Sequence, residues 1–134
     1  MKKCGILNSQ LARIIASMGH TDRLVICDCG LPIPRHSEVV DLALAPNIPR
    51  FLETLDVILQ ELQVQEIFLA NELEKRNNKL FQEIVSRFPN SEVNKVSHED
   101  LKILAANGGN IAFVRTGETT AYANVVLVSG VTFK

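Results

Sequence analysis

The chain has 134 residues, of which 46% are hydrophobic and 22% charged, and its formal net charge is −1 at pH 7. A chain of this length can form one domain with its own hydrophobic core, without disulfides or a structural metal. The near-neutral charge provides no basic surface for nucleic acid or an anionic membrane, and no stretch reaches the roughly 20 apolar residues that span a bilayer.

Helical and strand-like patterns alternate through the first half of the chain. The predicted elements are, in order, a helix over residues 11–18, a strand over 24–27, a loop over 30–34, a strand over 39–44 and a helix over 49–62. Gly19 is a suitable stop for the first helix, and Pro49 suits the first turn of the second. The strand over 24–27 leads directly to Asp28, which predicts a carboxylate where that strand ends.

The second half continues the alternation. Its predicted elements are a strand over 66–70, a helix over 78–88, a short strand over 93–96, a helix from 97 to Gly108-Gly109, and strands over 111–114 and 125–128. Ser97 is a good N-cap, and Asp100 stands three residues later, as in a capping box. A polar loop over residues 116–124 joins the last two strands.

This alternation predicts an α/β fold in which residues 1–134 form a single domain, with helices packed on a mixed or mostly parallel sheet. Ligands of open α/β sheets bind at the carboxyl ends of the strands. A site is therefore expected near Asp28 and near the residues that follow Val96.

The three cysteines are Cys4, Cys27 and Cys29. An odd number of cysteines, together with the lack of an evident signal peptide, favours a reducing cytoplasm over a disulfide framework. Cys27 and Cys29 are spaced wrongly for a C-x-x-C redox or zinc motif, so we interpret them as packed or incidental thiols.

The first polar cluster surrounds His20. This histidine lies just beyond a predicted helix end, where the helix dipole favours a positive charge, so it could hold and deliver a proton. The alternative is a histidine that only caps helix carbonyls. Asp28 could bind a sugar hydroxyl, or it could simply begin a turn.

Two further clusters contain groups suited to recognising hydroxyls. His98 opens a predicted helix, where it should be neutral and able both to donate and to accept a hydrogen bond, and Lys102 shares its face. Tyr122, the only tyrosine, offers a flat apolar ring and a hydroxyl beside the amide of Asn124. The alternatives are a solvated helix start and an ordinary loop. His36 receives no role.

Several other chemistries lack their motifs. The chain contains neither of the glycine-rich nucleotide-binding fingerprints, no H-E-x-x-H and no G-x-S-x-G elbow. Three scattered histidines do not have zinc-ligand spacing. We therefore expect no metal and no cofactor.

Taken together, these segments resemble the D-ribose pyranase family, relatives of the fucose mutarotases. The resemblance covers essentially the whole chain, and Gly-Leu-Pro-Ile-Pro at 30–34, after Asp28, favours the ribose branch. The other matching segments are 5–8 (Gly-Ile-Leu-Asn), 19–22 (Gly-His-Thr-Asp), 97–99 (Ser-His-Glu), 115–118 (Arg-Thr-Gly-Glu), 122–124 (Tyr-Ala-Asn) and 130–133 (Gly-Val-Thr-Phe). Cys29 and Ala121 depart from the family, which usually has Ala and Pro there.

The resemblance implies an enzyme that interconverts the pyranose and furanose forms of free D-ribose by general acid–base ring opening. It implies that His20 donates the proton and that the sugar contacts Asp28, His98, Tyr122, Ala123 and Asn124. It also implies a cytoplasmic homo-oligomer, with two pentameric rings stacked as a decamer and the site at a subunit interface. Two alternatives stay open: a mutarotase for fucose or another monosaccharide, and a sugar-binding module without turnover.

Overall fold

A computed structural model describes residues 1–134 and divides them into five helices and six strands. In chain order these are α1 (Ser9–Ser17), β1 (Arg23–Cys27), β2 (Glu38–Asp41), α2 (Phe51–Leu59), β3 (Val64–Ala70), α3 (Asn71–Arg76), α4 (Asn78–Val85), β4 (Glu92–Val96), α5 (His98–Ala106), β5 (Ile111–Arg115) and β6 (Val125–Ser129). No helix has the length and apolar character needed to cross a membrane.

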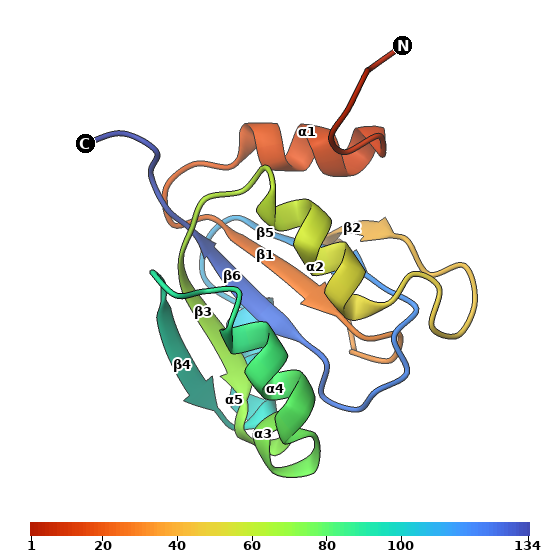
Figure 1. The fold of residues 1–134 in the computed structure, drawn as a ribbon, viewed down its shortest axis with the longest axis vertical. Coiled ribbons are helices and arrows are strands. Elements are labelled where there is room, and N and C mark those ends of the chain that lie inside the picture. Colours follow the sequence, from red (N-terminus) through yellow and green to blue (C-terminus); the bar gives the residue numbers. More distant parts are fainter.

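The six strands form one sheet in the order β2-β5-β1-β6-β3-β4. Strand β6 pairs antiparallel with both of its neighbours, β1 and β3. The other pairs, β2 with β5, β1 with β5, and β3 with β4, are parallel. Five strands therefore run in one direction and β6 alone runs against them, which confirms the predicted α/β fold on a mixed, mostly parallel sheet (Figure 1).

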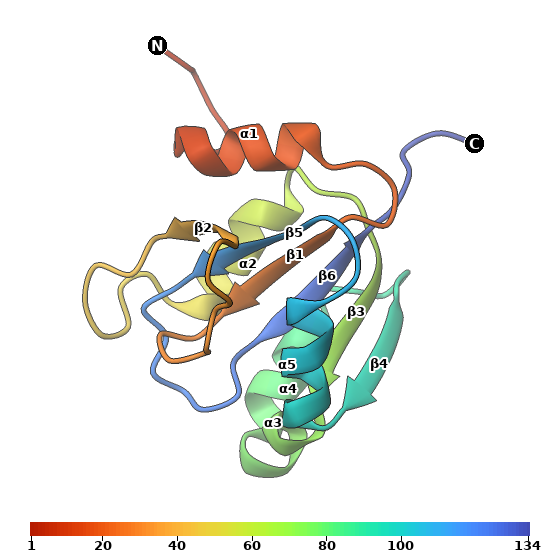
Figure 2. The ribbon, with the colours of Figure 1, turned by 180° about the vertical axis from the view of Figure 1, so that it is seen from behind.

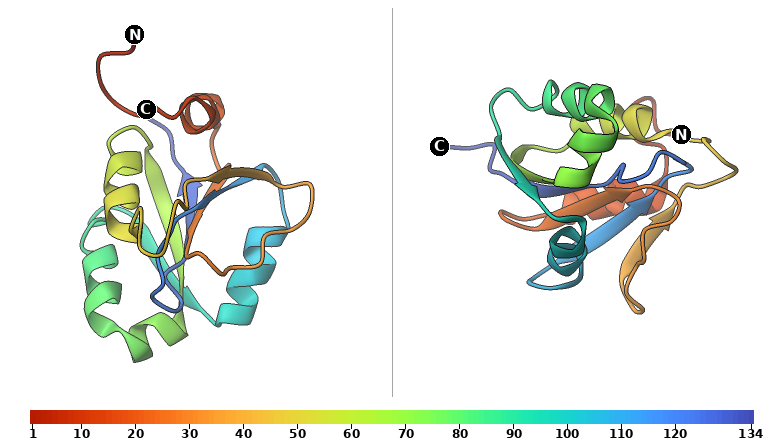
Figure 3. Two further views of the ribbon diagram at one scale, coloured as in Figure 1. Left: turned by 90° about the vertical axis from the view of Figure 1, so that its right-hand side faces the viewer. Right: turned by 90° about the horizontal axis from the view of Figure 1, so that it is seen from below.

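Helices cover both faces of this sheet. Helices α2, α3 and α4 lie over one face, and α1 packs beside α2 at one end of it (Figure 1). Helix α5 covers the opposite face, as the reverse view shows (Figure 2). The view from below separates the three layers (Figure 3). The sheet is thus buried between helices, which explains why the central strands read as continuous apolar runs.

Strand β1 shows how the sequence builds the two cores. Successive side chains of a strand point to opposite faces. Leu24 and Ile26 pack in the larger core with α1, α2 and α4. Val25 and Cys27 pack in the smaller core under α5. All four side chains are buried, so β1 is fixed in the centre of the sheet and Asp28 emerges at its end.

Two predicted helices differ from the structure at their boundaries. Pro49 lies outside α2, because the N-cap is Arg50 and the helix begins at Phe51. The prediction that Pro49 occupies the first helical turn is therefore wrong. Helix α4 ends at Val85, and Phe88, which was predicted to be helical, lies in the following turn and is buried in the core.

Strand β2 and helix α3 also differ from the prediction. Strand β2 ends at Asp41 rather than Leu44, because the Asp41 carboxylate accepts a hydrogen bond from the backbone N–H of Ala43 at 3.0 Å and turns the chain. Helix α3 was not predicted. It has six residues with Leu73 as its only buried side chain, so it carries no apolar period.

The N-terminal cap of α5 agrees with the sequence prediction. The Ser97 hydroxyl oxygen accepts a hydrogen bond from the backbone N–H of Asp100 at 3.1 Å. The backbone N–H of His98 donates to the Glu72 carboxylate of α3, at 3.0 and 3.1 Å to its two oxygens. Two unpaired donors of the first turn are thereby satisfied, and His98 is fixed at the helix start.

Candidate active site

The carboxyl edge of the sheet brings together most of the predicted site residues. The five parallel strands all end at this edge, and β6 begins there. Asp28 follows β1, His98 follows β4, and residues 122–124 precede β6. Because β6 lies between β1 and β3, the start of β6 stands beside the end of β1. These groups lie at the carboxyl ends of the strands, where ligands of open α/β sheets bind.

Asp28 and Asn124 form a two-way hydrogen-bonded pair. The Asn124 side-chain oxygen accepts from the backbone N–H of Asp28 at 2.9 Å, and its amide nitrogen donates to Asp28 Oδ2 at 3.2 Å. Asp28 Oδ1 accepts from the backbone N–H of Gly30 at 2.9 Å. Asn124 is fully buried and Asp28 is half-buried. The carboxylate is therefore held in one orientation while part of it stays accessible to a ligand.

His98 and Tyr122 form the second part of the site. Their rings meet edge to face, with centroids 5.0 Å apart and an angle of 78° between planes. The His98 Nδ1 atom is buried and has no hydrogen-bond partner. A buried ring nitrogen without a partner costs free energy unless a ligand supplies one. Nδ1 is therefore a candidate atom for contact with a substrate hydroxyl.

Tyr122 is held in an unusual backbone conformation. Its φ angle is 65°, in the left-handed region of backbone conformations that residues other than Gly, Asn and Asp rarely adopt. Arg76 belongs to α3, and its guanidinium carbon lies 5.9 Å from the centre of the Tyr122 ring. Such strained positions cluster at functional sites. Ala123, the next residue, is fully buried in the larger core.

His20 lies at the other end of the sheet. It precedes β1, whereas Asp28 follows it, and a five-residue strand is about 16 Å long at about 3.3 Å per residue. Its ring nitrogen Nε2 is 2.9 Å from Gln65 Oε1. The ring is exposed beside a cavity of about 320 Å³ that the C-terminal residues Ser129–Phe133 help to line. One copy of the chain does not bring His20 together with the other predicted residues.

Two other groups singled out in the sequence, Lys102 and Cys27, have structural roles. Lys102 forms an ion pair with Glu99 at 2.8 Å, which lowers the pKa of the Glu99 carboxyl. Cys27 is buried, and burial, followed by the nearby Asp28 charge, raises the pKa of its thiol to about 12. It is therefore a packed, protonated thiol, as the sequence predicted. No group of three or more His, Cys, Asp or Glu side chains is placed to hold a metal ion.

The 116–124 loop that carries Tyr122 and Asn124 is fastened to the segment before α2. The backbone N–H of Gly117 donates to the Pro49 carbonyl at 2.9 Å. Asn47 Oδ1 accepts from both the backbone N–H and the hydroxyl of Thr119, at 3.0 and 2.9 Å. On the other side, Thr116 bonds through its hydroxyl to the Cys27 carbonyl at 2.7 Å. These contacts place the loop at the edge of the site.

Gly117 permits this close packing. A Cβ atom there would lie 2.5 Å from the Ala45 carbonyl oxygen and 2.6–2.7 Å from backbone atoms of Ile48. We expect Gly117→Ala to lower the free energy of unfolding by about 1–3 kcal/mol, the usual cost of overpacking. Urea denaturation should show no such loss for Gly19→Ala, because the nearest atom to its added Cβ is 3.8 Å away. Equal stability of the two variants would contradict this account of the loop.

Sequence reasoning missed three residues that support the site: Glu72, Arg76 and Glu118. Glu72 and Arg76 belong to α3, a short polar helix without a periodic signal. Glu118 belongs to the Arg-Thr-Gly-Glu segment that carried part of the family resemblance, and its near-complete burial could not be read from a polar loop. A signal for Glu118 was present in that motif, whereas none marked the other two.

Comparisons with known proteins identify the family of this chain. A model of the RbsD / FucU transport protein family matches residues 1–132. D-ribose pyranases of Clostridium tetani and Lactiplantibacillus plantarum are 47% and 46% identical to the chain, over 99% of it and 100% of each relative. RbsD of Bacillus subtilis, solved in complex with D-ribose, matches with a TM-score of 0.92 and 42% identity, over 99% of this chain and 100% of that one. A fucose mutarotase of Streptococcus pneumoniae, solved with L-fucose, matches with a TM-score of 0.70 and 25% identity, over 95% of each chain. The chain therefore belongs to the RbsD / FucU transport protein family.

Proposed function

We propose that the protein is a D-ribose pyranase, an isomerase that interconverts the pyranose and furanose forms of free D-ribose. The observation that carries this proposal is full-length similarity, at 46–47% identity, to D-ribose pyranases of two bacteria. The pair of Asp28 and Asn124, with His98 and Tyr122 beside it, supplies the polar and aromatic groups that suit a small sugar. The lower TM-score and identity of the fucose mutarotase favour ribose over fucose.

The reaction needs only the transfer of protons. A pyranose opens when its ring oxygen gains a proton and its anomeric hydroxyl loses one, which breaks the bond between the ring oxygen and the anomeric carbon. The open chain rotates, and a different hydroxyl attacks the aldehyde carbon to close the furanose. That hydroxyl loses its proton and the aldehyde oxygen gains one, so the numbers of protons given and taken balance. A general acid contributes about 10²–10⁴-fold to such a step. We propose that this reaction requires neither a metal nor a cofactor.

The binding groups have complementary hydrogen-bonding capacities. The Asp28 carboxylate accepts hydrogen bonds, and its orientation is fixed by Asn124 and by the N–H of Gly30. His98 Nδ1 is a buried ring atom that still needs a partner. Tyr122 contributes an apolar ring edge and a hydroxyl. We propose that these groups and the backbone around Ala123 bind the sugar.

His20 is the proposed proton donor, and it requires a second copy of the chain. It lies at the amino end of β1, about one strand length away from Asp28, so a sugar held at the carboxyl edge is out of its reach in one copy. We propose that an adjacent subunit presents its His20 to that sugar. Rings of five subunits, two of which stack as a decamer, are the assembly we propose.

Exposed apolar side chains support contact between copies. The large hydrophobic residues that stay at least one-third exposed in the isolated chain include Leu7, Leu44, Ile48, Val57 and Phe133. Isolated apolar residues are common on surfaces, but nine exposed large ones on a chain this short suit a subunit interface. All three cysteines are free, which supports a reducing compartment, and we propose that the protein works in the cytoplasm.

The direct test is ribose exchange measured by NMR saturation transfer. Adding the protein to equilibrated D-ribose should increase the exchange rate between pyranose and furanose signals and leave their populations unchanged, because a catalyst lowers barriers only. L-fucose serves as the control sugar and should exchange more slowly. Unchanged exchange at a protein concentration that binds ribose would contradict the enzyme and favour a sugar-binding module. Faster exchange of fucose than of ribose would favour a fucose mutarotase.

A further inference from the structure

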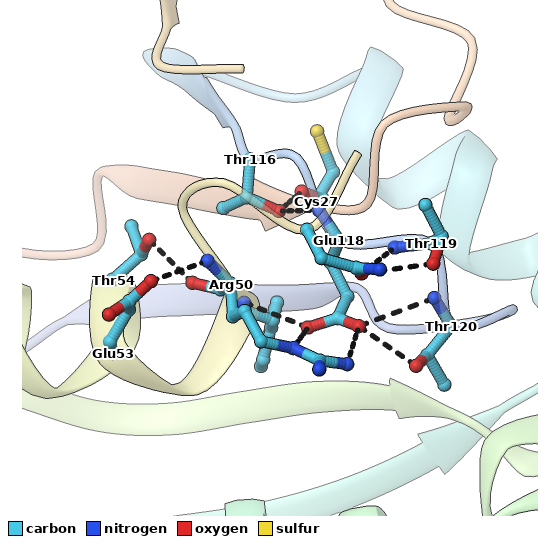
Figure 4. A network of polar contacts seen from close by, with 10 residues as sticks. Cys27, Arg50, Glu53, Thr54, Thr116, Glu118, Thr119 and Thr120 are labelled. Carbon is cyan, nitrogen blue, oxygen red and sulfur yellow. Dashed lines mark hydrogen bonds and ion pairs between the residues drawn. The ribbon is translucent and has the colours of Figure 1, made fainter. Parts of the chain in front are cut away.

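We propose that Glu118 is a positioning residue that fixes Tyr122 for contact with the sugar, an inference that rests on the proposed function. Glu118 lies in the 116–124 loop, and its side chain is 5% exposed (Figure 4). It does not reach the predicted sugar-binding groups itself. It acts through Thr120, two residues before Tyr122.

Five donors converge on the Glu118 carboxylate. Oε1 accepts from the backbone N–H of Phe51 at 3.0 Å and from Arg50 Nε at 3.3 Å. Oε2 accepts from the Arg50 guanidinium at 2.9 Å, and from the hydroxyl and backbone N–H of Thr120 at 2.8 and 3.3 Å. The carboxylate therefore joins the first residues of α2 to the middle of the loop (Figure 4).

Few other hydrogen bonds hold the part of the loop that follows Thr120. The backbone N–H of Ala123 donates to the Thr120 carbonyl at 3.4 Å, and that of Asn124 donates to the Tyr122 carbonyl at 2.8 Å. Asn124 is anchored in turn by Asp28. The backbone of Tyr122 is thus held between Thr120 on Glu118 and Asn124 on Asp28, while its ring packs against His98 and the larger core. Its left-handed backbone conformation persists only if the surroundings hold it.

A carboxylate suits this position better than an amide. All five partners donate, and a carboxylate only accepts. Burial alone would raise the pKa of Glu118, but hydrogen bonds from Arg50, Phe51 and Thr120 together with the Arg50 charge hold it at about 2. Because this folded-state pKa lies below the unfolded value, the anchor is fully present above the unfolded pKa and weakens only as pH falls toward 2. A glutamine there would turn an amide nitrogen toward at least one of the donors.

The chain contains its own reporter for this loop. Tyr122 is the only tyrosine and there is no tryptophan, so tyrosine fluorescence reports the surroundings of Tyr122 alone. Acrylamide quenching of this fluorescence measures how freely the ring is reached from solvent. This readout depends on loop position and does not require catalytic activity.

The variant Glu118→Gln tests the proposal, with Asp56→Asn as its matched control. Asp56 lies on α2 and, like Glu118, forms an ion pair with an arginine, in this case Arg87, away from the loop. We expect Glu118→Gln to weaken ribose binding about tenfold in calorimetry, as for the loss of one charged hydrogen bond, and to increase acrylamide quenching clearly. Asp56→Asn should lose thermal stability and leave both readouts at wild-type values.

The outcomes separate this inference from the proposed function. Wild-type ribose affinity and quenching in Glu118→Gln would overturn the positioning role. If that variant fails to fold, Thr120→Val decides the question, since it removes only the hydroxyl that donates to Oε2. Stronger quenching and weaker ribose binding in Thr120→Val support the role, and unchanged values overturn it. A wild-type protein that neither binds nor exchanges ribose would refute the function, whereas quenching still reports whether Glu118 holds Tyr122.

Discussion

Replacing His20 with alanine is expected to slow pyranose–furanose exchange of D-ribose at least about a hundredfold, the low end of the contribution of one general acid. The ribose affinity should stay near the wild-type value, because the groups that hold the sugar stand at the opposite end of β1. Saturation-transfer NMR measures the exchange rate, and calorimetry measures the affinity. The side chain is exposed, so the substitution should leave the fold intact.

His36→Ala is the matched control for His20→Ala. His36 is also an exposed histidine in a connecting segment, and it forms no hydrogen bond through its ring. The His36→Ala variant should therefore catalyse ribose exchange at the wild-type rate. Full turnover in His20→Ala would contradict the assignment of the proton donor and make His98 the next residue to test, because its Nδ1 atom lacks a partner.

The second large effect is expected at the pair of Asp28 and Asn124. Asp28→Ala removes a charged acceptor, which costs about 1.5–3 kcal/mol and weakens ribose binding about 10- to 150-fold. Asn124→Ala removes a partner that orients Asp28, so it should weaken binding as well, though less. Because the two side chains contact each other, the double variant should lose less than the sum of the single losses.

Calorimetry on the three variants completes a double-mutant cycle. We expect a coupling free energy of at least about 0.5 kcal/mol between the two positions. Asp41→Ala is a suitable control, since this exposed carboxylate pairs with Arg115 at the end of β2 and should leave ribose affinity unchanged. Strictly additive losses would show that Asn124 contacts the sugar independently of Asp28. An unchanged affinity in Asp28→Ala would contradict the location of the site.

Much of the fold could be predicted because its signals are local. The apolar run at 24–27 and the alternation of strands and helices identified every strand of the sheet, and Ser97 marked the start of α5. The antiparallel direction of β6 could not be predicted from these signals. A buried strand has the same continuous apolar run whether it is parallel or antiparallel to its neighbours. Helix α3 was missed because it buries only Leu73.

The site shows the same division between local and long-range information. The ends of β1 and β4, and the start of β6, located Asp28, His98 and Asn124 without knowledge of their contacts. The direct bond between Asp28 and Asn124 joins positions 96 residues apart, so no local pattern could reveal it. The separation of His20 from Asp28 follows from which end of β1 each residue occupies, and it was not predicted from the sequence, because both residues were placed in one polar cluster.

The most direct test of the shared site is a complementation experiment with two impaired variants, His20→Ala and Asp28→Ala, at a ribose concentration well below the Kd of Asp28→Ala, where the weakened binding of that variant also limits its exchange. In a mixed oligomer, each subunit of one variant can supply the group that its neighbour lacks. Random mixing in equal amounts should restore about one site in four to its intact form, because a closed ring repeats the same interface between neighbours. The two proteins can be produced together with different tags and purified through both.

Exchange of D-ribose in that mixed preparation decides the outcome. The proposed arrangement predicts an exchange rate of about one quarter of the wild-type rate, far above the rate of either variant alone. A mixed oligomer that exchanges ribose no faster than its parents would show that His20 and Asp28 must come from the same copy, and it would contradict the shared site.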